Sequence, residues 1–224
     1  MPSGLPLLAI IVLVALSFDF INGFHDTANA IATSVSTRVL SPRAAIFMAS
    51  SLNVLGAWLV GTAVAETVGR GIVNPEVVTQ TTVLAALLGA ILWNLLTWYL
   101  GLPSSSSHAL IGGVAGAAVQ VAGVAALNLA GLGKIFFSLL SSPVFGLVVG
   151  FGIMIALMWI FRRHSLAAVN GYFRYLQVAS AAFMAFSHGS NDAQKTMGII
   201  TLALVSFGFL DSFHVPLWVI LAAA

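Results

Sequence analysis

Long apolar runs fill most of this chain, and short polar or charged segments separate them. A helix that spans a bilayer needs about 20 mostly apolar residues. By that measure we expect spans over residues 5–34, 44–68, 81–100, 109–129, 135–160 and 172–206, with another that begins at 215. The pattern predicts an all-α fold, a polytopic bundle of transmembrane helices.

The composition supports a membrane protein. Hydrophobic residues make up 60% of the chain, charged residues 6%, and the mean hydropathy is +1.07. Soluble domains carry about 25% charged residues. The net charge of +2 therefore does not indicate a nucleic-acid partner. The absence of cysteine excludes disulfides and thiolate metal sites. The first apolar run follows no Lys or Arg and precedes no cleavage pattern, so we interpret it as a helix, not a signal peptide.

The positions of the arginines predict an orientation. Cytoplasmic loops are enriched in Lys and Arg. One group follows the first span and another follows the fifth: Arg38, Arg43, Arg162, Arg163 and Arg174. Placing both groups in the cytoplasm puts the N-terminus outside. The predicted location is the inner (plasma) membrane, crossed several times.

Two segments with matching polar spacing each place a carboxylate inside apolar sequence. Residues 20–29 contain Asp26, and residues 186–195 contain Asp192. A charged side chain at the centre of a membrane helix costs about 2.5–3.5 kcal/mol on insertion scales. A matched pair of such residues indicates one shared task, the binding of an ion or solute within the membrane. Gly23 and Gly189 precede the two carboxylates, so we expect both spans to be broken into half-helices.

An odd number of crossings separates the two motifs, so the second enters the membrane in the opposite sense. This predicts inverted-topology repeats, as in many secondary transporters. Residues 1–165 would form the first repeat, and residues 166–224 would begin the second. We expect the second repeat to be truncated, because the counterpart of the serine-rich segment at 101–112 should lie beyond Ala224.

A serine-rich segment at 101–112 joins the third and fourth spans, and no Lys, Arg, Asp or Glu occurs from Val77 to Gly133. A loop so free of charge is typical of a re-entrant hairpin whose tip lies in protein or a wet cavity. Four hydroxyls followed by an apolar run indicate a capped helix start, where amide groups and the helix dipole favour anions. A plain polar turn with a serine cap is the alternative interpretation.

The Asp motifs also supply candidate ligands for a cation. Asn22, Asp26 and Asn29 have the spacing of one helix face, and His188, Asp192 and Lys195 repeat it. Carboxylate and amide oxygens suit Na⁺, or a carboxylate can carry a proton. The alternative is a structural ion pair, above all between Asp192 and Lys195. His25, His108 and His188 lie in or beside these motifs and could carry a proton. Asn53 and Asn94 are expected to hydrogen-bond between helices.

These residues resemble the inorganic phosphate transporter (PiT) family. The resemblance covers all six complete spans and rests on residues 22–33, 101–112 and 187–198. It implies inverted repeats and cation-coupled phosphate uptake at a site built from the two Asp helices and hairpin tips. The implied phosphate-binding residues are Ser104, Ser105, Ser106, Ser107, Gln194 and Lys195. The implied coupling-ion residues are Asn22, Asp26, Asn29, Asn191 and Asp192, with Na⁺ at Asp26, Asn29 and Asp192 as one choice.

Two positions depart from the sodium-coupled pattern, which has Asn at both: His25 and Lys195. Both departures resemble the bacterial low-affinity branch of permeases, for which protons and neutral metal-phosphate are the implied cargo. The predicted partners are therefore inorganic phosphate, a coupling cation (H⁺ or Na⁺), the lipid bilayer and a second copy in a homodimer. No cofactor is expected, beyond a divalent metal moved with phosphate.

The sequence thus favours a secondary transporter of inorganic phosphate that works by alternating access and is not an enzyme. A transporter of another oxyanion such as sulfate is the nearest alternative. An intramembrane hydrolase that uses Ser106 or Ser107 with a histidine is more remote, since no G-x-S-x-G or H-E-x-x-H motif is present. A structural or regulatory membrane subunit is the third alternative.

Overall fold

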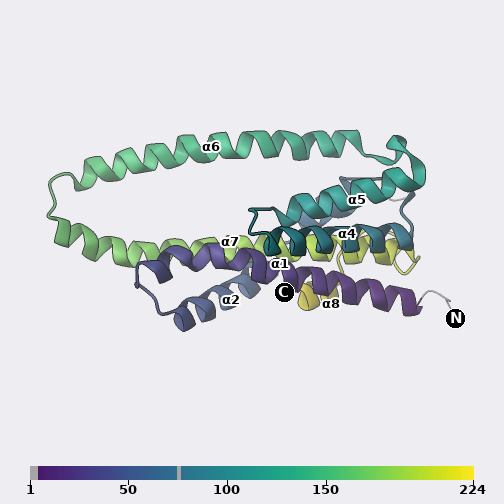
Figure 1. Ribbon diagram of the computed structural model, residues 1–224, viewed down its shortest axis with the longest axis horizontal. Helices are drawn as coiled ribbons and strands as arrows, with labels where there is room; N and C mark the ends of the chain where they lie inside the picture. Colours follow the sequence, from purple (N-terminus) through teal and green to yellow (C-terminus); the bar gives the residue numbers. More distant parts are fainter. Residues whose placement is uncertain (1–4, 75–76) are drawn as a thin grey trace.

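Helices make up the fold of this computed structural model, which describes residues 5–74 and 77–224, without the side chains of residues 25, 27 and 28. In chain order they are α1 (Leu5–Ser36), α2 (Pro42–Leu59), α3 (Ala63–Arg70), α4 (Gln80–Tyr99), α5 (Ser106–Ala122), the short 3₁₀ helix η2 (Val124–Ala126), α6 (Leu129–Phe161), α7 (Leu166–Ser206) and α8 (Leu217–Ala223). The predicted all-α class is confirmed (Figure 1).

Hydroxyl side chains cap several helix starts, as expected for residues that satisfy unpaired amide groups. The Oγ of Ser41 accepts from the Ala44 amide at the start of α2, and that of Ser165 accepts from the Ala168 amide at the start of α7. At α4, Thr79 forms a capping box with the third helical residue. These local signals explain where the apolar runs become helical.

Three helices of the described chain are long and apolar enough to cross a membrane: α1, α4 and α6. The pair α2 and α3 together gives a fourth candidate, bent by 73°. The 41-residue α7 is long enough, but its polar motif lowers the hydropathy of its middle. The structure thus bears out a membrane protein with several spanning helices.

A bend divides the second predicted span. We expected one helix over 44–68, but α2 ends at Leu59 and α3 begins at Ala63. Gly61 lies between them with φ +71°, in the left-handed region that residues with a side chain rarely adopt. The apolar run is continuous in sequence, so hydropathy alone did not reveal this break.

The two Asp helices are not broken, and that prediction was wrong. Both α1 and α7 continue through Gly23 and Gly189. A Cβ at Gly189 would lie 2.2 Å from the Cα of Asn53, so this glycine permits α7 to pack closely on α2. The helix α6 likewise continues through Pro143.

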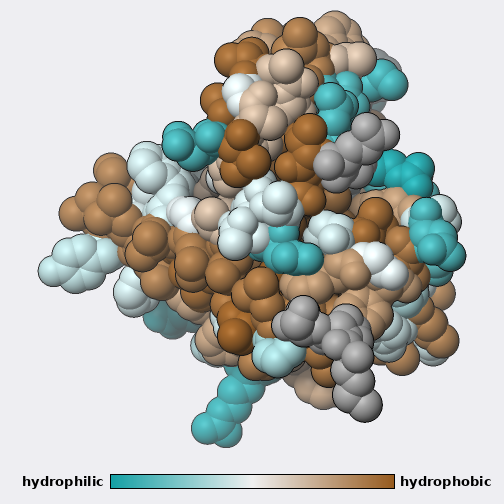
Figure 2. Space-filling model, turned by 90° about the vertical axis from the view of Figure 1, so that its right-hand side faces the viewer, coloured by the Kyte–Doolittle hydropathy of each residue, from teal (hydrophilic) through white to brown (hydrophobic). Residues whose placement is uncertain are grey.

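An antiparallel hairpin of α4 and α5 packs beside α1, and residues 100–105 form its tip. A core of small and branched apolar side chains joins α1, α3, α4, α5 and α7. By contrast, α6 has no buried residue and lies along one side of the bundle (Figure 1). Figure 2 shows apolar residues over much of one end of the molecule. An apolar exterior of this kind suits lipid or another apolar helix.

Candidate functional site

The two Asp motifs meet the serine tip, which is the segment from Ser104 to Ser107 at the turn of the hairpin and the start of α5. The Lys195 ammonium on α7 lies where they meet and is only 4% exposed. Its Nζ donates to the Oγ atoms of Ser106 and Ser107 at 3.1 Å each, and it lies 2.8 Å from Oδ1 of Asp192. An ammonium has three hydrogen-bond donors. These three contacts therefore match its full donor capacity.

Asp192 accepts contacts on both carboxylate oxygens. While Oδ1 faces Lys195, Oδ2 accepts from Nδ2 of Asn22 at 2.9 Å and lies 3.0 Å from Nε2 of His188. The contact with Asn22 joins α7 to α1, and those with His188 and Lys195 stay within α7. The sequence-based alternative of a local ion pair between Asp192 and Lys195 is thus present, but as part of a larger network.

Ser106 connects the first carboxylate to this network. Its hydroxyl donates to Oδ2 of Asp26 at 3.0 Å while it accepts from Lys195. The hydroxyl is placed by the start of α5, where Ser105 caps the helix by accepting from the His108 amide. A continuous chain of polar contacts therefore runs from Asp26 through Ser106 and Lys195 to Asp192.

Asp26 also faces a cavity of about 300 Å³, which Asn29, Ser104, Ser105, Met184 and His188 line as well. Asp192 faces a separate cavity, and His188 lines both. The trio of Asp26, Asn29 and Asp192 suggested for Na⁺ therefore does not surround one cavity. Ser104 also accepts a hydrogen bond from Nε1 of Trp93 at 3.1 Å.

Gln194 precedes Lys195 in the chain, but its side chain caps the start of another helix, α3. Its Oε1 accepts from the amides of Val64 at 2.8 Å and Ala65 at 3.4 Å, and its Nε2 donates to the Ser190 carbonyl at 2.6 Å. The N-cap residue of α3, Thr62, makes no side-chain cap bond. Gln194 thus supplies the missing cap from α7, and both ends of its amide are engaged by the protein.

Two larger cavities lie on the other side of Lys195. One of about 500 Å³ is lined by Lys195, Ser107 and Asn191, together with parts of α3 and α6. Asn191 is exposed and donates to the Ser187 carbonyl, so its amide oxygen has no protein partner among the described hydrogen bonds. The second cavity, of about 640 Å³, lies between α3 and α6.

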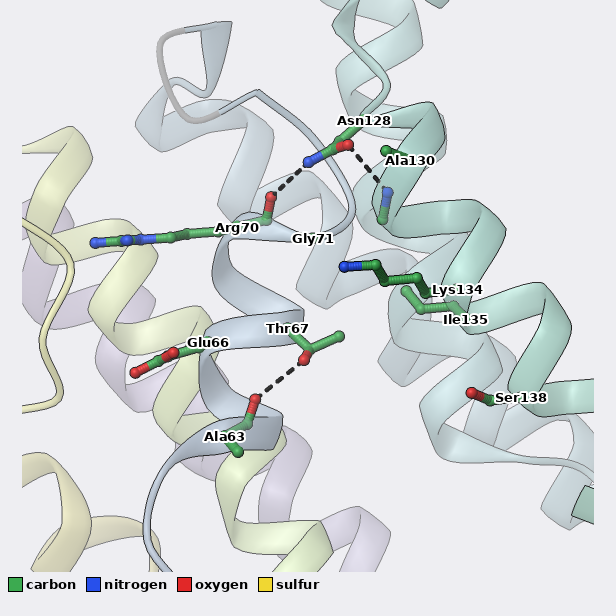
Figure 3. A pocket seen from close by; sticks show the side chains of 11 residues that line it. Ala63, Glu66, Thr67, Arg70, Gly71, Asn128, Ala130, Lys134, Ile135 and Ser138 are labelled. Atoms are coloured by element: carbon green, nitrogen blue, oxygen red, sulfur yellow. Dashed lines mark hydrogen bonds between the residues drawn. The ribbon is translucent and has the colours of Figure 1, made fainter.

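These two cavities share the walls formed by Thr67, Ile135 and Ser138. Figure 3 shows the larger one, with the Lys134 side chain extended from α6 toward α3. The Arg70 side chain instead points away and donates to the Phe213 carbonyl at 3.0 Å. The two cavities therefore adjoin, and together they are called the hollow between Lys134 and Lys195.

Sequence reasoning missed Asp19, and it expected Asn53 to hydrogen-bond between helices, although the buried Oδ1 of Asn53 has no partner among the described residues. Asp19 and Asn53 line the same cavity as Asn22, His188 and Asp192. The spacing of Asp19 from Asn22 and Asp26 places it on the same face of α1, a signal that was available in the sequence.

Three further residues singled out in the sequence are His25, His108 and Asn94. The side chain of His25 lies outside the described residues, and that of His108 is exposed. Both amide atoms of Asn94 are buried without a partner, contrary to the expected bond between helices.

The chemistry of the site is that of an anion cradle beside carboxylates. Among the described residues, no group of three or more His, Asp or Glu side chains could hold a metal ion. An ammonium and two hydroxyls at the start of a 17-residue helix instead favour an anion. Two carboxylates flank that cradle, so a bound anion would also need cations nearby.

Comparison with known proteins is consistent with this chemistry. The chain is 52% identical over 218 residues to a probable low-affinity inorganic phosphate transporter of Bacillus subtilis, covering 96% of this chain and 65% of that protein. It is 48% identical over 217 residues to one from Rhizobium meliloti, covering 96% and 65%. It is 37% identical over 232 residues to the low-affinity inorganic phosphate transporter PitB of Escherichia coli, covering 91% and 46%. The chain thus spans just under two thirds of the first two relatives.

A solved structure supports the fold independently. The sodium-dependent phosphate transporter superposes with a TM-score of 0.81 over 98% of this chain and 73% of that one, at 21% identity. Residues 22–224 also match the sequence pattern of the Phosphate transporter family. Since that match includes both Asp motifs and the serine tip, this chain belongs to the Phosphate transporter family.

Proposed function

We propose that the chain forms the substrate-binding part of a secondary transporter that moves inorganic phosphate, or metal-phosphate, with a cation gradient. The observation that carries the proposal is the Lys195 ammonium, held between Asp192 and the hydroxyls of Ser106 and Ser107. The matched relatives are themselves named as phosphate transporters.

Phosphate would bind at the serine tip. The Lys195 ammonium and the Ser107 hydroxyl would supply donors, and the positive end of the α5 dipole adds to their field. The Ser106 hydroxyl would join them only by releasing Asp26, to which it donates. In the described arrangement, however, Asp192, Ser106 and Ser107 occupy all three donors of the ammonium. Phosphate binding therefore requires Lys195 to exchange at least one protein acceptor for a phosphate oxygen. Gln194 has no part in this step, because its amide caps α3.

The carboxylates supply the coupling. Asp26 and Asp192 are joined to the serine tip, so a phosphate bound there would be repelled by two negative charges. Lys195 offsets only one of them. A cation that enters with phosphate removes the repulsion, and each species then improves the binding of the other. Without the cation, repulsion from the two carboxylates would weaken phosphate binding and limit its uptake.

The hollow between Lys134 and Lys195 provides a route to the tip. Its mouth carries the exposed Lys134, and its inner end carries Ser107 and Lys195. A cation at a mouth raises the local concentration of anions and their rate of entry. By the predicted orientation, this mouth faces the outside of the cell. The inverted repeats would then expose the site alternately to the two sides of the inner membrane.

Two alternatives are less well supported. Among the described residues, no serine hydroxyl hydrogen-bonds a histidine ring, and Ser106 is held between Asp26 and Lys195. Its hydroxyl thus lacks the histidine partner of the Ser-His pair on which the hydrolase alternative rests. A transporter of sulfate would use a similar cradle, and only competition can separate the two anions.

The test is uptake of radiolabelled phosphate into proteoliposomes that contain the full-length protein. Sodium and proton gradients are imposed separately, each with and without Mg²⁺, and unlabelled sulfate is added as competitor. The proposal expects uptake that one of the gradients accelerates and that excess phosphate, but not sulfate, suppresses. Equal uptake with no gradient of either cation would contradict it.

A further inference from the structure

A small polar cavity lies between α1, α2 and α7, and Asp192 is one of its walls. Its volume is about 140 Å³, and its polar walls are Asp19, Asn22, Asn53, His188 and Asp192. Neither Lys195 nor any hairpin serine lines it. It is thus a compartment separate from the cavities proposed for phosphate.

The amide oxygens in this cavity lack donors. Nδ2 of Asn22 donates to Asp192, which fixes the amide, since a flipped amide would place its oxygen against a carboxylate. Oδ1 of Asn22 is then left without a partner, although the residue is only 1% exposed. Oδ1 of Asn53 is also buried without a partner in the described chain. Buried acceptors without partners are rare in folded proteins and call for an explanation.

The charges around the cavity are also unbalanced. Asp19 and Asp192 contribute two carboxylates, and the ion pairs of the described residues here both involve Asp192, not Asp19. The Lys195 ammonium is already shared among Asp192 and two serines. The wall residue from α2 is an asparagine, and that from α8 is Ala223. Among the described residues that line the cavity, His188 is the other titratable group beside the two carboxylates, and its Nε2 lies 3.0 Å from Oδ2 of Asp192.

Carboxylate oxygens and buried amide oxygens that lack donors are the ligands that a hard cation prefers, and the cavity offers both: the Asp19 carboxylate, which Thr196 also contacts, and the amide oxygens of Asn22 and Asn53. A water molecule occupies about 30 Å³ in the liquid, so the cavity of about 140 Å³ can hold a small cation that keeps part of its hydration. We propose that this cavity binds Na⁺ through the Asp19 carboxylate and the amide oxygens of Asn22 and Asn53.

The site also offers a means of coupling, and this part rests on the proposed transport function. Asp192 belongs to both compartments, because Oδ1 faces Lys195 while the residue lines the cation cavity. A cation beside Asp192 weakens its hold on the Lys195 ammonium. The ammonium is then available to a phosphate oxygen at the serine tip. Cation binding would therefore come before tight phosphate binding.

The test measures Na⁺ binding without any transport. The full-length protein is purified in detergent without phosphate, and its unfolding temperature is recorded as NaCl replaces choline chloride at constant ionic strength. A ligand that binds the folded state raises this temperature with its concentration. We expect a rise for the wild type, no rise for Asp19→Asn, and an apparent Na⁺ affinity weakened roughly tenfold for Asn53→Ala. Asp211→Asn, an exposed position outside the site, is the matched control and keeps the full response.

The proposal would be overturned if the unfolding temperature of the wild type changed with pH but not with Na⁺. It would also be overturned if Na⁺ raised the unfolding temperature of Asp19→Asn as much as that of the wild type. If Asp19→Asn does not fold, an unchanged Na⁺ affinity in Asn53→Ala would overturn the proposal. Intact Na⁺ binding together with no phosphate uptake in proteoliposomes would contradict the transport proposal and leave the cation site standing.

Discussion

The Ser106 hydroxyl donates to Oδ2 of Asp26 at 3.0 Å, although the two residues lie 80 positions apart in the chain. The same hydroxyl accepts from Lys195, so the hairpin tip touches both Asp helices through one atom. A movement of the Ser106 hydroxyl therefore changes the contacts of Asp26 directly and those of Asp192 through Lys195. This arrangement suits a site at which an anion and a cation depend on each other.

Ser106→Ala removes the link between Asp26 and Lys195. Each lost hydrogen bond involves a charged partner, and such bonds contribute about 1.5–3 kcal/mol. We expect the initial rate of phosphate uptake to fall roughly 10- to 100-fold at constant protein level. Ser141→Ala is the control, because that hydroxyl is exposed and bonds only within α6. Uptake within twofold of wild type in Ser106→Ala would remove the hydroxyl from the site.

Lys195→Met leaves the Asp192 carboxylate without its ammonium. Loss of one partner from a buried ion pair costs about 3–5 kcal/mol. Asp192 is 17% exposed, so we expect the lower end of that range in thermal or denaturant unfolding. The double variant Lys195→Met/Asp192→Asn should recover part of the loss, since no unpaired charge remains. A double variant less stable than Lys195→Met alone would show that the unpaired Asp192 charge is not what destabilises Lys195→Met.

Gly189→Ala should separate α7 from α2. The added methyl group would lie 2.2 Å from the Asn53 Cα and 2.3 Å from its carbonyl oxygen, and backbone cannot easily yield. Overpacking of this kind costs about 1–3 kcal/mol. The matched control is Gly23→Ala, at the equivalent position of the first motif, where the new Cβ meets nothing within 4 Å. Unfolding temperatures compare the two, and equal effects would contradict the close approach.

Gln194→Ala distinguishes a helix cap from a phosphate ligand. The change leaves the Val64 and Ala65 amides without an acceptor, and a lost cap costs about 1 kcal/mol. We expect lower stability with an unchanged KM for phosphate uptake in the folded protein. Gln177→Ala serves as control, since its Oε1 makes an exposed contact with Thr37. A raised KM at unchanged stability would return Gln194 to the phosphate site.

The sequence predicted well where the signal is local. Apolar runs located most helices, because spanning helices need long apolar stretches. The serine run predicted the capped start of α5, since Ser105 accepts from an amide three residues on. The spacing of Asp192 and Lys195 predicted their ion pair.

It predicted less where the cause is tertiary. The glycine of each Asp motif was interpreted as a helix break, yet Gly189 is small because the Asn53 backbone packs against it. The sequence did not reveal that Gln194 caps α3, because α3 comes from a distant part of the chain. Asp19 was overlooked because the matched motif began after it, although its helical spacing from Asp26 was visible.

Uptake of labelled phosphate by Asp26→Asn tests the central claim most directly. The full-length protein is reconstituted in proteoliposomes under the gradient that drives the wild type, with Asp211→Asn as the exposed control. Asn keeps the size of the side chain but removes its charge, so the coupling between cation and phosphate should fail. We predict uptake at the level of empty liposomes for Asp26→Asn and normal uptake for the control. Uptake like that of the wild type in Asp26→Asn would contradict the account.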